Sequence, residues 1–456
     1  MKKMILSMLT LALVLSILVG CGSNVQTSSS QNIQGDSSNR NAPAQSNTST
    51  NATVSEKPVE IEFWYGLGGK LGENVEKFIQ EFNAMQNEVK VKGVAQGNYT
   101  ETYQKLQAGI ASRKVPAAVL LDASTIHALA NKQVLASMDS LINADQNFHP
   151  EDFVHAFYSL GTINGSQYAL PIYGTTQVLY YRKDFFEKEG ISPDVLNTWE
   201  SLSKAAAQLT KKNGNEVQRY GWEPMWGSGN LIDAALSNGA KFVSDDGKKV
   251  LIDSPEWVEA WEFFRKAIHE DKIMRIHYGG QGWEYWYKTI DDVMQGRAAG
   301  YTGSSGDQGD LDFSIIAAHT QPGWEGKPAK PIAGALMVSI PALASPEEQA
   351  AAFQWIKFFT SPEKTAEWSM NTGYIAVRKS AREVEAYKKF AEEHPQILVP
   401  LKQAETASPL FTDPTGGKIT DALSKAADRV EIEGVPAADA LRAAKEEAQK
   451  ALDQVK

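Results

Sequence analysis

Residue types that carry catalysis or bind metals are present in this chain, but their spacing matches no catalytic motif. The seven histidines show no H-E-x-x-H pattern or other close ligand pair, and the single cysteine excludes a site of several thiolates. No G-x-S-x-G sequence is present, so a nucleophile elbow is not expected. Asp307, Asp310 and Asp312 could bind calcium, but their spacing departs from an EF-hand loop and favours a solvated acidic turn. We therefore expect no enzyme, no metal site and no cofactor.

Aromatic residues gather in two polar, glycine-containing segments, residues 222–227 and 283–287. Aromatic rings commonly hold polar ligands by stacking. The first segment lacks a clean helical or strand period, which leaves two interpretations open, that the indoles pack in a core or that they stack on a ligand. We expect ligand contact from Trp226, Trp283 and Trp286.

A glycine-rich turn at residues 65–70 lies between an expected strand, residues 59–64, and a segment with apolar residues at helical spacing, residues 71–85. Its glycines miss the G-x-G-x-x-G spacing, and Lys70 is followed by leucine, so neither a dinucleotide site nor a P-loop is expected. Two interpretations remain open, a tight turn and a helix N-terminus whose free N–H groups bind ligand hydroxyls or an anion.

Further strands and helices alternate along the following chain, with strands expected at 89–94 and 117–121 and a helix at 103–111. This alternation predicts an α/β fold with a mostly parallel sheet, whose ligands bind beyond the carboxyl ends of the strands. That rule selects three candidate ligand contacts: Trp64, Tyr65 and Asp122.

The length of 456 residues is sufficient for two or three domains, and 42% hydrophobic residues exclude disorder for most of the chain. The formal net charge of −10 argues against nucleic acid or an anionic membrane surface as the main partner.

The N-terminal residues predict export and lipid anchoring. Lys2 and Lys3 precede an apolar run, so residues 1–20 are expected to form a signal peptide. The run ends Leu-Val-Gly-Cys, which resembles a bacterial lipobox and predicts lipidation of Cys21. Residues 21–58 are rich in serine, asparagine and glutamine and are expected to form a flexible tether. The expected location is therefore the outer face of the cell membrane.

Residues 168–186, with the sequence YALPIYGTTQVLYYRKDFF, carry the main resemblance to a known family. They resemble the signature segment of bacterial extracellular solute-binding proteins of family 1, which includes the maltose- and glycerol-3-phosphate-binding proteins of ABC importers. Further segments that resemble the family follow in its order: residues 97–99, 115–117, 301–306, 331–335 and 372–377. The resemblance implies a monomer that captures a small solute and delivers it to permease subunits.

By the same resemblance the fold is a two-lobed periplasmic-binding-protein fold with three hinge crossovers. The N-lobe is expected to hold residues 59–151 and 319–362, and the C-lobe residues 152–318 and 363–456. Such lobes close over a ligand by hinge motion.

Matching positions imply ligand contacts at Tyr99, Thr175, Ser304, Ser305, Gly334 and Tyr374. Tyr173, within the segment that carries the resemblance, is a further expected ligand contact. These residues supply hydroxyls, a backbone amide and ring faces, which suit a polyol. Glycerol-phosphate binders have an acidic residue where Ala123 aligns, although Asp122 lies one position away in this chain. They also carry an arginine near residues 412–418, where this chain has none and only Lys418 could substitute as a point charge. Arginine is the best bidentate phosphate partner, so a neutral sugar or oligosaccharide is expected ahead of glycerol-3-phosphate or a glycerophosphodiester. An exported glycoside hydrolase is a more distant alternative, and a surface adhesin fits the anchor but not the ordered family segments.

Overall fold

The computed structural model describes residues 57–408 and 410–455. The expected signal peptide, Cys21 and nearly all of the expected tether lie outside these residues. Among the described residues, none of the helices combines the length and apolar character that crossing a membrane requires.

The first part of the chain alternates strands with helices, as the sequence predicts. Helix α1 places Val75, Phe78, Ile79 and Phe82 on one buried face, because these positions recur at helical spacing. The elements up to the long strand β6 are β1 (Val59–Tyr65), α1 (Gly69–Met85), β2 (Val89–Ala95), α2 (Tyr99–Ser112), β3 (Ala118–Asp122), α3 (Ala123–Asn131), α4 (Asp139–Ala144), η1 (Pro150–Asp152), α5 (His155–Tyr158), η2 (Ser159–Gly161), β4 (Thr162–Ile163), β5 (Ser166–Gln167) and β6 (Ala169–Arg182).

The remaining elements complete both lobes. They are α6 (Lys183–Lys188), η3 (Pro193–Asn197), α7 (Trp199–Leu209), β7 (Lys211–Asn213), β8 (Glu216–Arg219), β9 (Glu223–Pro224), α8 (Ser228–Ser237), α9 (Pro255–His269), α10 (Glu284–Met294), β10 (Gly300–Ser304), η4 (Ser305–Asp310), β11 (Ile316–His319), β12 (Ala333–Ser339), α11 (Pro346–Phe359), α12 (Pro362–Thr372), η5 (Ser380–Glu383), α13 (Glu385–Glu393), η6 (Pro395–Leu398), α14 (Val399–Ala404), α15 (Lys418–Glu431) and α16 (Ala437–Leu452).

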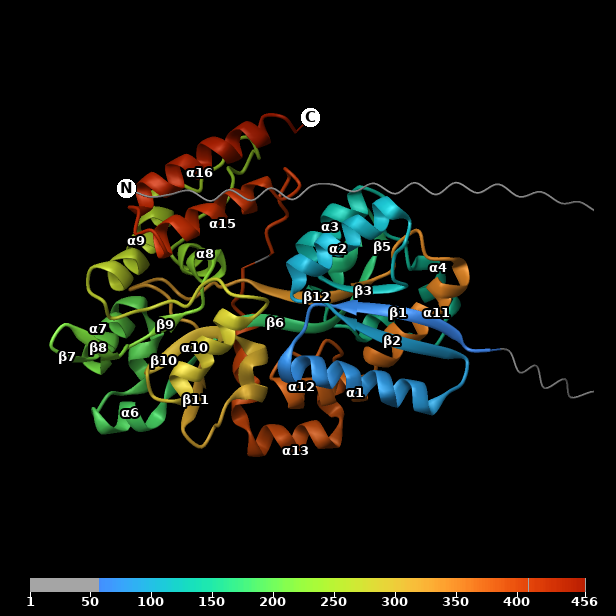
Figure 1. Ribbon diagram of the computed structural model, residues 1–456, viewed down its shortest axis with the longest axis horizontal. Coiled ribbons are helices and arrows are strands. Elements are labelled where there is room, and N and C mark those ends of the chain that lie inside the picture. The colour runs from blue at the N-terminus through green and yellow to red at the C-terminus, as the bar shows by residue number, and fades with distance from the viewer. Residues whose placement is uncertain (1–56, 409, 456) are drawn as a thin grey trace, which may run out of the picture. The chain divides into compact units, whose positions relative to one another are not determined.

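One sheet joins the two lobes through β6 and β12. Its strand order is β2-β1-β3-β12-β6-β10-β9, and β11 also pairs with β6. The pairs β1–β2 and β1–β3 are parallel, whereas β12 pairs antiparallel with both β3 and β6. Figure 1 shows β6 and β12 running side by side between two groups of helices and strands.

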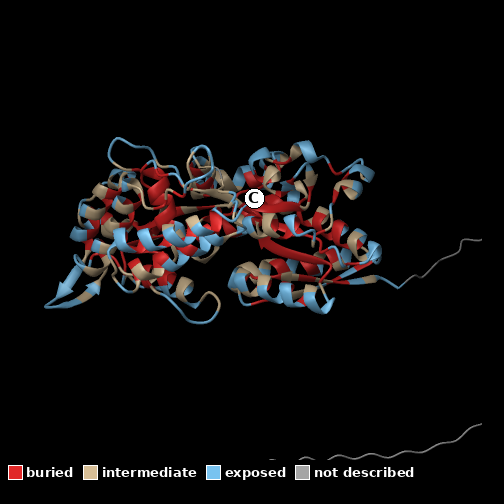
Figure 2. Cartoon of the chain, turned by 90° about the horizontal axis from the view of Figure 1, so that it is seen from above, coloured by how far each residue is buried: buried red, intermediate tan, exposed pale blue. Residues whose placement is uncertain are grey.

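The two lobes have separate hydrophobic cores. The first core draws its residues from 61–173 and 335–377, and the second from 179–299 and 419–452. Figure 2 shows buried residues in the strands and on the inner faces of the helices, with exposed residues outside. The chain therefore passes between the lobes three times: within β6, at the start of β12, and between residues 377 and 419.

The packing divides the chain at positions other than the predicted boundaries. Residues 153–173 pack in the first core although they were expected in the C-lobe, because β6 changes lobes in mid-strand. Trp368 of α12 also packs in the first core, with its ring centroid 5.9 Å from that of Phe78. Conversely, Trp324 and Ile332, predicted to lie in the N-lobe, pack against the second core.

Candidate functional site

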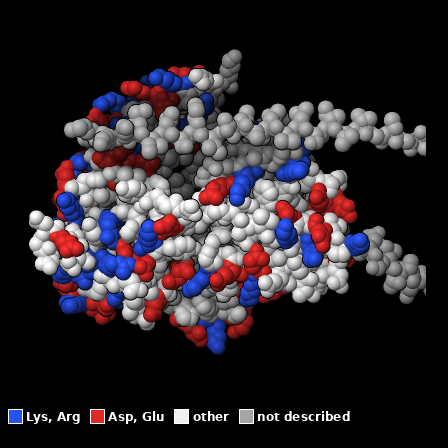
Figure 3. Space-filling model, viewed as in Figure 1, with Lys and Arg blue, Asp and Glu red and all other residues white. Residues whose placement is uncertain are grey.

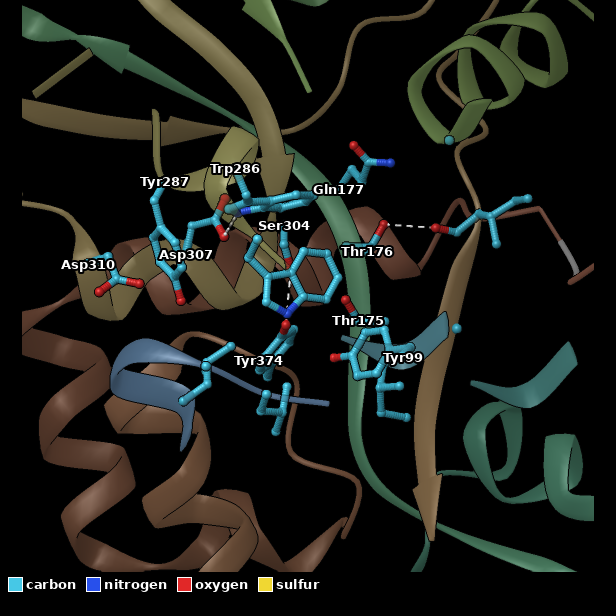
Figure 4. Close-up of a pocket in the computed structure, with 18 of the residues that line it drawn as sticks. Tyr99, Thr175, Thr176, Gln177, Trp286, Tyr287, Ser304, Asp307, Asp310 and Tyr374 are labelled. Atoms are coloured by element: carbon cyan, nitrogen blue, oxygen red, sulfur yellow. Dashed lines mark hydrogen bonds between the residues drawn. The ribbon is translucent and has the colours of Figure 1, made fainter. Parts of the chain in front are cut away.

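A cavity of about 380 Å³ lies between the lobes, and both lobes line it. The first lobe contributes residues after β1, at the start of α2 and in β12, and the second contributes α8, α10, β10 and η4. The middle of β6 lines the cavity as well, and Figure 4 shows labelled side chains of α2, β6, α10, β10 and η4 around a common space. This is where the carboxyl-end rule for α/β sheets predicts a ligand site.

Tyrosines form one wall. Tyr99 is the first residue of α2, which Asn98 caps by accepting a hydrogen bond from the Glu101 N–H at 2.9 Å. The Tyr99 hydroxyl lies 3.2 Å from that of Tyr173, and the Tyr173 ring stacks on Tyr374 with centroids 4.2 Å apart. Burial raises the pKa of Tyr99 and Tyr374 well above the usual tyrosine value, so both hydroxyls are neutral hydrogen-bonding groups.

The aromatic segment that begins α10 forms the facing wall. Trp283 donates from Nε1 to the carbonyl oxygen of Gly66 at 3.1 Å, which is a hydrogen bond between the lobes. Trp286 donates from Nε1 to Oδ1 of Asp307 at 2.8 Å. The two indoles are nearly perpendicular, with centroids 5.8 Å apart, so they present one face and one edge rather than a flat stack.

Neutral polar groups from β6 and β10 line the space between these walls. Thr175, Thr176 and Gln177 follow one another where β6 crosses between lobes, and all three line the cavity. The Thr176 hydroxyl donates to the Ile332 carbonyl, whereas Oε1 of Gln177 is buried without a hydrogen-bond partner. A ligand N–H or O–H would satisfy this acceptor, since a buried unpaired polar atom costs about 1–3 kcal/mol.

Three carboxyl groups also line the cavity, those of Asp233, Asp307 and Asp310. Burial raises the pKa of Asp233 to about 7 and that of Asp307 to about 8. Burial also raises the pKa of Asp310, and Lys70 at 3.8 Å opposes that rise. No lysine or arginine lines the cavity within the residues that the structure describes. The site thus offers hydroxyls, rings and carboxyls.

The cavity brings together several of the residues that the sequence predicts as ligand contacts: Tyr99, Thr175, Trp283, Trp286, Ser304, Gly334 and Tyr374. Three distant parts of the chain meet in this group, because β6, β10 and β12 are neighbours in the sheet.

Three other predicted residues do not line the cavity. Tyr173 is fully buried between Tyr374 and Trp368, where it supports the Tyr374 ring from behind. Ser305 is also fully buried, and its Oγ accepts from the Thr176 N–H at 3.4 Å. Trp226 donates from Nε1 to Asp428 at 2.8 Å inside the second lobe.

The three predicted residues at strand ends do not line this cavity, because their side chains are hydrogen-bonded to residues close to them in sequence. Trp64 donates from Nε1 to Glu62 on the same strand, and Tyr65 is buried with its hydroxyl donating to Glu76. Asp122 caps α3 by accepting from the Thr125 N–H at 2.9 Å. The cavity lies at the sheet edge that the rule selects, but the loops beyond that edge, rather than the last strand residues, line it.

Sequence reasoning missed several lining residues, above all Gln177, Asp233 and Asp307. Gln177 lies in the signature segment and carries no further signal. Asp233 lies in α8, whose apolar sequence predicts only core packing. Asp307 belongs to an acidic run that reads as solvated, and only the pairing of β10 with β6 shows that η4 is directed inward.

A second cluster of titratable side chains lies behind α10. Atoms of Glu223, His277 and Asp292 that could coordinate a metal lie within 4.8 Å of one another. Arg275 already binds Glu223 Oε1 at 2.6 Å and also contacts Asp292, so a guanidinium occupies the place of a cation. Burial raises the pKa of Glu223 to about 8; although burial also acts on Asp292, hydrogen bonds from His277 and Arg297 lower its pKa to about 2. Through Asp292 this network holds α10, the helix that also carries Trp286 and Tyr287.

Comparison with known proteins identifies the family. A family model for bacterial extracellular solute-binding proteins matches residues 77–396. The chain belongs to this family. The sn-glycerol-3-phosphate-binding periplasmic protein UgpB of Escherichia coli K12 is 25% identical over 364 residues, which cover 77% of this chain and 81% of that protein.

Solved structures of family proteins show the same fold. UgpB from Mycobacterium tuberculosis, in complex with glycerophosphocholine, gives a TM-score of 0.76 at 23% identity and covers 88% of this chain and 99% of its own. The maltose-bound MalE3 of Thermotoga maritima gives a TM-score of 0.75 at 22% identity, with 86% of this chain and 99% of that one covered. The expected two-lobed solute-binding fold is confirmed, and this chain is a binding protein of the ABC-importer class rather than an enzyme.

Proposed function

We propose that this protein captures a carbohydrate or another polyhydroxylated solute in the cavity between its lobes and delivers it to an ABC permease. The observation that carries the proposal is the composition of the cavity wall. Rings of Tyr99, Trp283, Trp286 and Tyr374 surround neutral hydrogen-bonding groups, and no lysine or arginine lines the cavity in the described ranges. Sugars offer apolar C–H faces to rings and hydroxyls to such polar groups.

A glycerophosphodiester is the second candidate, and a specific observation favours it. Helices α1 and α8 both begin at the cavity wall, with Gly68 and Gly229 lining it. The N-cap residues of both helices are glycines, which make no side-chain capping hydrogen bond. Free N–H groups at a helix N-terminus bind phosphate without an arginine. The similarity to UgpB proteins of two species supports this candidate.

We also propose that Cys21 carries the lipid that anchors this protein outside the cell membrane. The support is the lipobox-like sequence Leu18–Cys21 after an apolar run, together with membership of an extracellular family.

On the face shown in Figure 3, acidic and basic side chains are interspersed. This distribution agrees with a folded part that does not bind a charged polymer.

A thermal-shift panel tests the solute. We would incubate the protein with maltose, trehalose, glucose, glycerol-3-phosphate and glycerophosphocholine, and recover each solute afterwards. A solute at 100 times its Kd stabilises the fold by about 2.7 kcal/mol, which raises the Tm by several degrees. Unchanged solute with a raised Tm supports a binding protein, whereas chemical conversion supports an enzyme, and no shift with any sugar or polyol contradicts the proposal.

Gly334→Leu tests whether the solute binds in this cavity, because the larger side chain would fill part of it. A Cβ at Gly334 meets no atom within 4 Å, and the residue lines the cavity, so the leucine side chain extends into the space for the solute. We expect the variant to fold with the ordinary Tm and to lose the ligand-induced shift. An unchanged shift would place the solute elsewhere.

A further inference from the structure

The three carboxyl groups that line the cavity differ in the partners that neutralise them or donate hydrogen bonds to them. Asp310 faces Lys70, whose ammonium lies 3.8 Å away. Asp233 accepts from the Ile332 N–H at 2.9 Å and from Gln321 Nε2 at 2.7 Å. Asp307 lines the same cavity and has no lysine, arginine or histidine within salt-bridge distance among the described residues.

Asp307 is held only by neutral donors. Trp286 donates to its Oδ1 at 2.8 Å, and the Tyr301 hydroxyl donates to its Oδ2 at 3.2 Å. The residue is 5% exposed, and this burial raises its pKa to about 8. An ionised Asp307 would therefore carry a charge that nothing in the described part of the chain neutralises.

Aromatic rings lie on the same side of the cavity. Figure 4 shows Asp307 between Trp286 and Tyr287, with Tyr374 below them and Gln177 on the opposite side. Trp283 completes this group, with its centroid 5.8 Å from that of Trp286. Aromatic faces attract cations, most strongly where water is excluded, and a carboxylate beside them adds to the attraction. The unpaired Oε1 of Gln177 adds another acceptor to the wall.

We propose that the solute carries an ammonium group, which binds beside Asp307 and the aromatic rings of Trp283, Trp286 and Tyr287. This inference rests on the proposed function and narrows its solute class, from any polyhydroxylated compound to one with a positive charge. The group could belong to an amino sugar or to the headgroup of a glycerophosphodiester such as glycerophosphocholine. In both cases the ammonium supplies the counter-charge that Asp307 lacks.

The proposal requires affinity to depend on pH. An ammonium ligand binds the ionised form of Asp307, so with a pKa of about 8 its apparent affinity rises about tenfold from pH 6 to pH 7. A neutral ligand shows no such rise. Five tyrosines lie around Asp307, and because burial raises the pKa of each, they stay neutral from pH 6 to pH 7: Tyr180, Tyr285, Tyr287, Tyr301 and Tyr374. Lys70 and Glu73 face the adjacent Asp310, whose pKa is raised by burial. Asp233 lines the same cavity and, with a pKa of about 7, also ionises in this interval, so the neutral member of each probe pair and Asp307→Asn are needed to assign the pH dependence to Asp307.

The test compares two pairs of probes that differ in one charge, by calorimetry at pH 6 and pH 7. The pairs are glycerophosphocholine with glycerophosphoglycerol, and glucosamine with glucose. We expect the ammonium member of one pair to bind about tenfold more tightly than its neutral partner at pH 7, and to gain affinity from pH 6 to pH 7. The pair that responds identifies the source of the ammonium.

Asp307→Asn supplies the variant, because the amide keeps the shape of the side chain and loses its charge. It should reduce the preference for the ammonium member to within about twofold and abolish the pH dependence. Asp312→Asn, an exposed change in the neighbouring loop, should leave both unchanged. Three outcomes would overturn the inference. The two members of each pair bind equally, the preference for the ammonium member survives Asp307→Asn, or neither ammonium probe binds. In those cases a Tm shift with a neutral sugar still leaves the proposed function standing, whereas no shift with any solute removes both.

Discussion

Replacing Trp283 by phenylalanine tests whether contacts between the lobes contribute to solute affinity. The indole N–H donates to the Gly66 carbonyl at 3.1 Å, and this bond exists only when the lobes approach as they do here. Phenylalanine keeps an aromatic edge against Tyr99, whose centroid lies 5.4 Å away, but it cannot donate. One such hydrogen bond is worth about 0.5–1.5 kcal/mol, so the Kd should rise about twofold to twelvefold.

Trp226→Phe is the matched control, since it removes an indole hydrogen bond of similar length within one lobe. Its Nε1 donates to Asp428 at 2.8 Å, and it does not line the cavity. We expect this variant to lower the Tm and to leave the Kd unchanged. Titration calorimetry with the solute found in the thermal-shift panel measures the Kd, and scanning calorimetry measures the Tm.

Trp283 also lines the cavity, so a second measurement must separate closure from direct contact. We would follow the distance between the lobes of the unliganded protein by fluorescence energy transfer between two surface dyes. If the hydrogen bond to Gly66 favours closure, Trp283→Phe should reduce the fraction of unliganded protein in which the lobes are closed. If Trp283 acts only by contacting the solute, this fraction should not change. An unchanged closed population and Kd for Trp283→Phe, or equal effects from Trp226→Phe, would refute the reasoning.

Three further predictions concern the glycine turn, a buried carboxyl and the anchor. Gly69 has a φ of +51° and its added Cβ would lie 2.5 Å from the Tyr287 hydroxyl, whereas a Cβ at Gly68 meets nothing nearer than 3.8 Å. Calorimetry should therefore show weaker solute binding for Gly69→Ala than for Gly68→Ala, and only partial recovery in Gly69→Ala/Tyr287→Phe, because alanine stays strained at this φ after the hydroxyl is removed. Burial raises the pKa of Asp233 from its usual 3.8 to about 7, so its protonated form stabilises the fold, and this contribution, up to about 4 kcal/mol, is lost as pH rises from 4 to 7. Asp233→Asn should flatten that part of the Tm–pH curve, and an unchanged slope would contradict the assignment. Cys21→Ser should release the protein from membranes in a fractionation assay, because a lipid chain contributes about 0.8 kcal/mol per buried CH₂, and full retention would refute the anchor.

The sequence predicts the strands and helices of the first lobe closely because their signals are local. The strand expected at residues 59–64 is observed as β1, Val59–Tyr65, and the helix expected from residue 71 begins two residues earlier. The lobe boundaries depend instead on β6, which continues as one strand from Ala169 to Arg182 and passes from one core to the other at the polar residues Thr175, Thr176 and Gln177. Periodicity cannot reveal a change of lobe inside a continuous strand.

The candidate site was predicted best where the family resemblance supplied positions and least where burial decides the role. Thr175, Ser304 and Tyr374 line the cavity as expected from matching segments. Trp226 and Trp286 were indistinguishable in sequence, since both are indoles in polar segments; their hydrogen-bond partners, Asp428 and Asp307, separate a lobe-internal contact from a cavity wall. Such partners lie far away in the sequence and no local pattern identifies them.

The segments that would hold the solute are also the segments that join the lobes. Thr176 of β6 donates through its backbone N–H to Ser305 at the start of η4, and its hydroxyl donates to the carbonyl of Ile332, just before β12. Thr175 and Asp307 lie one and two residues from these contacts and line the cavity. A solute beside Thr175 and Asp307 would touch the connection and the second lobe, and Tyr99, which lines the same cavity, adds a contact from the first lobe. Because a ligand shifts a conformational equilibrium only by its differential affinity for the two states, contacts from both lobes are what favour closure.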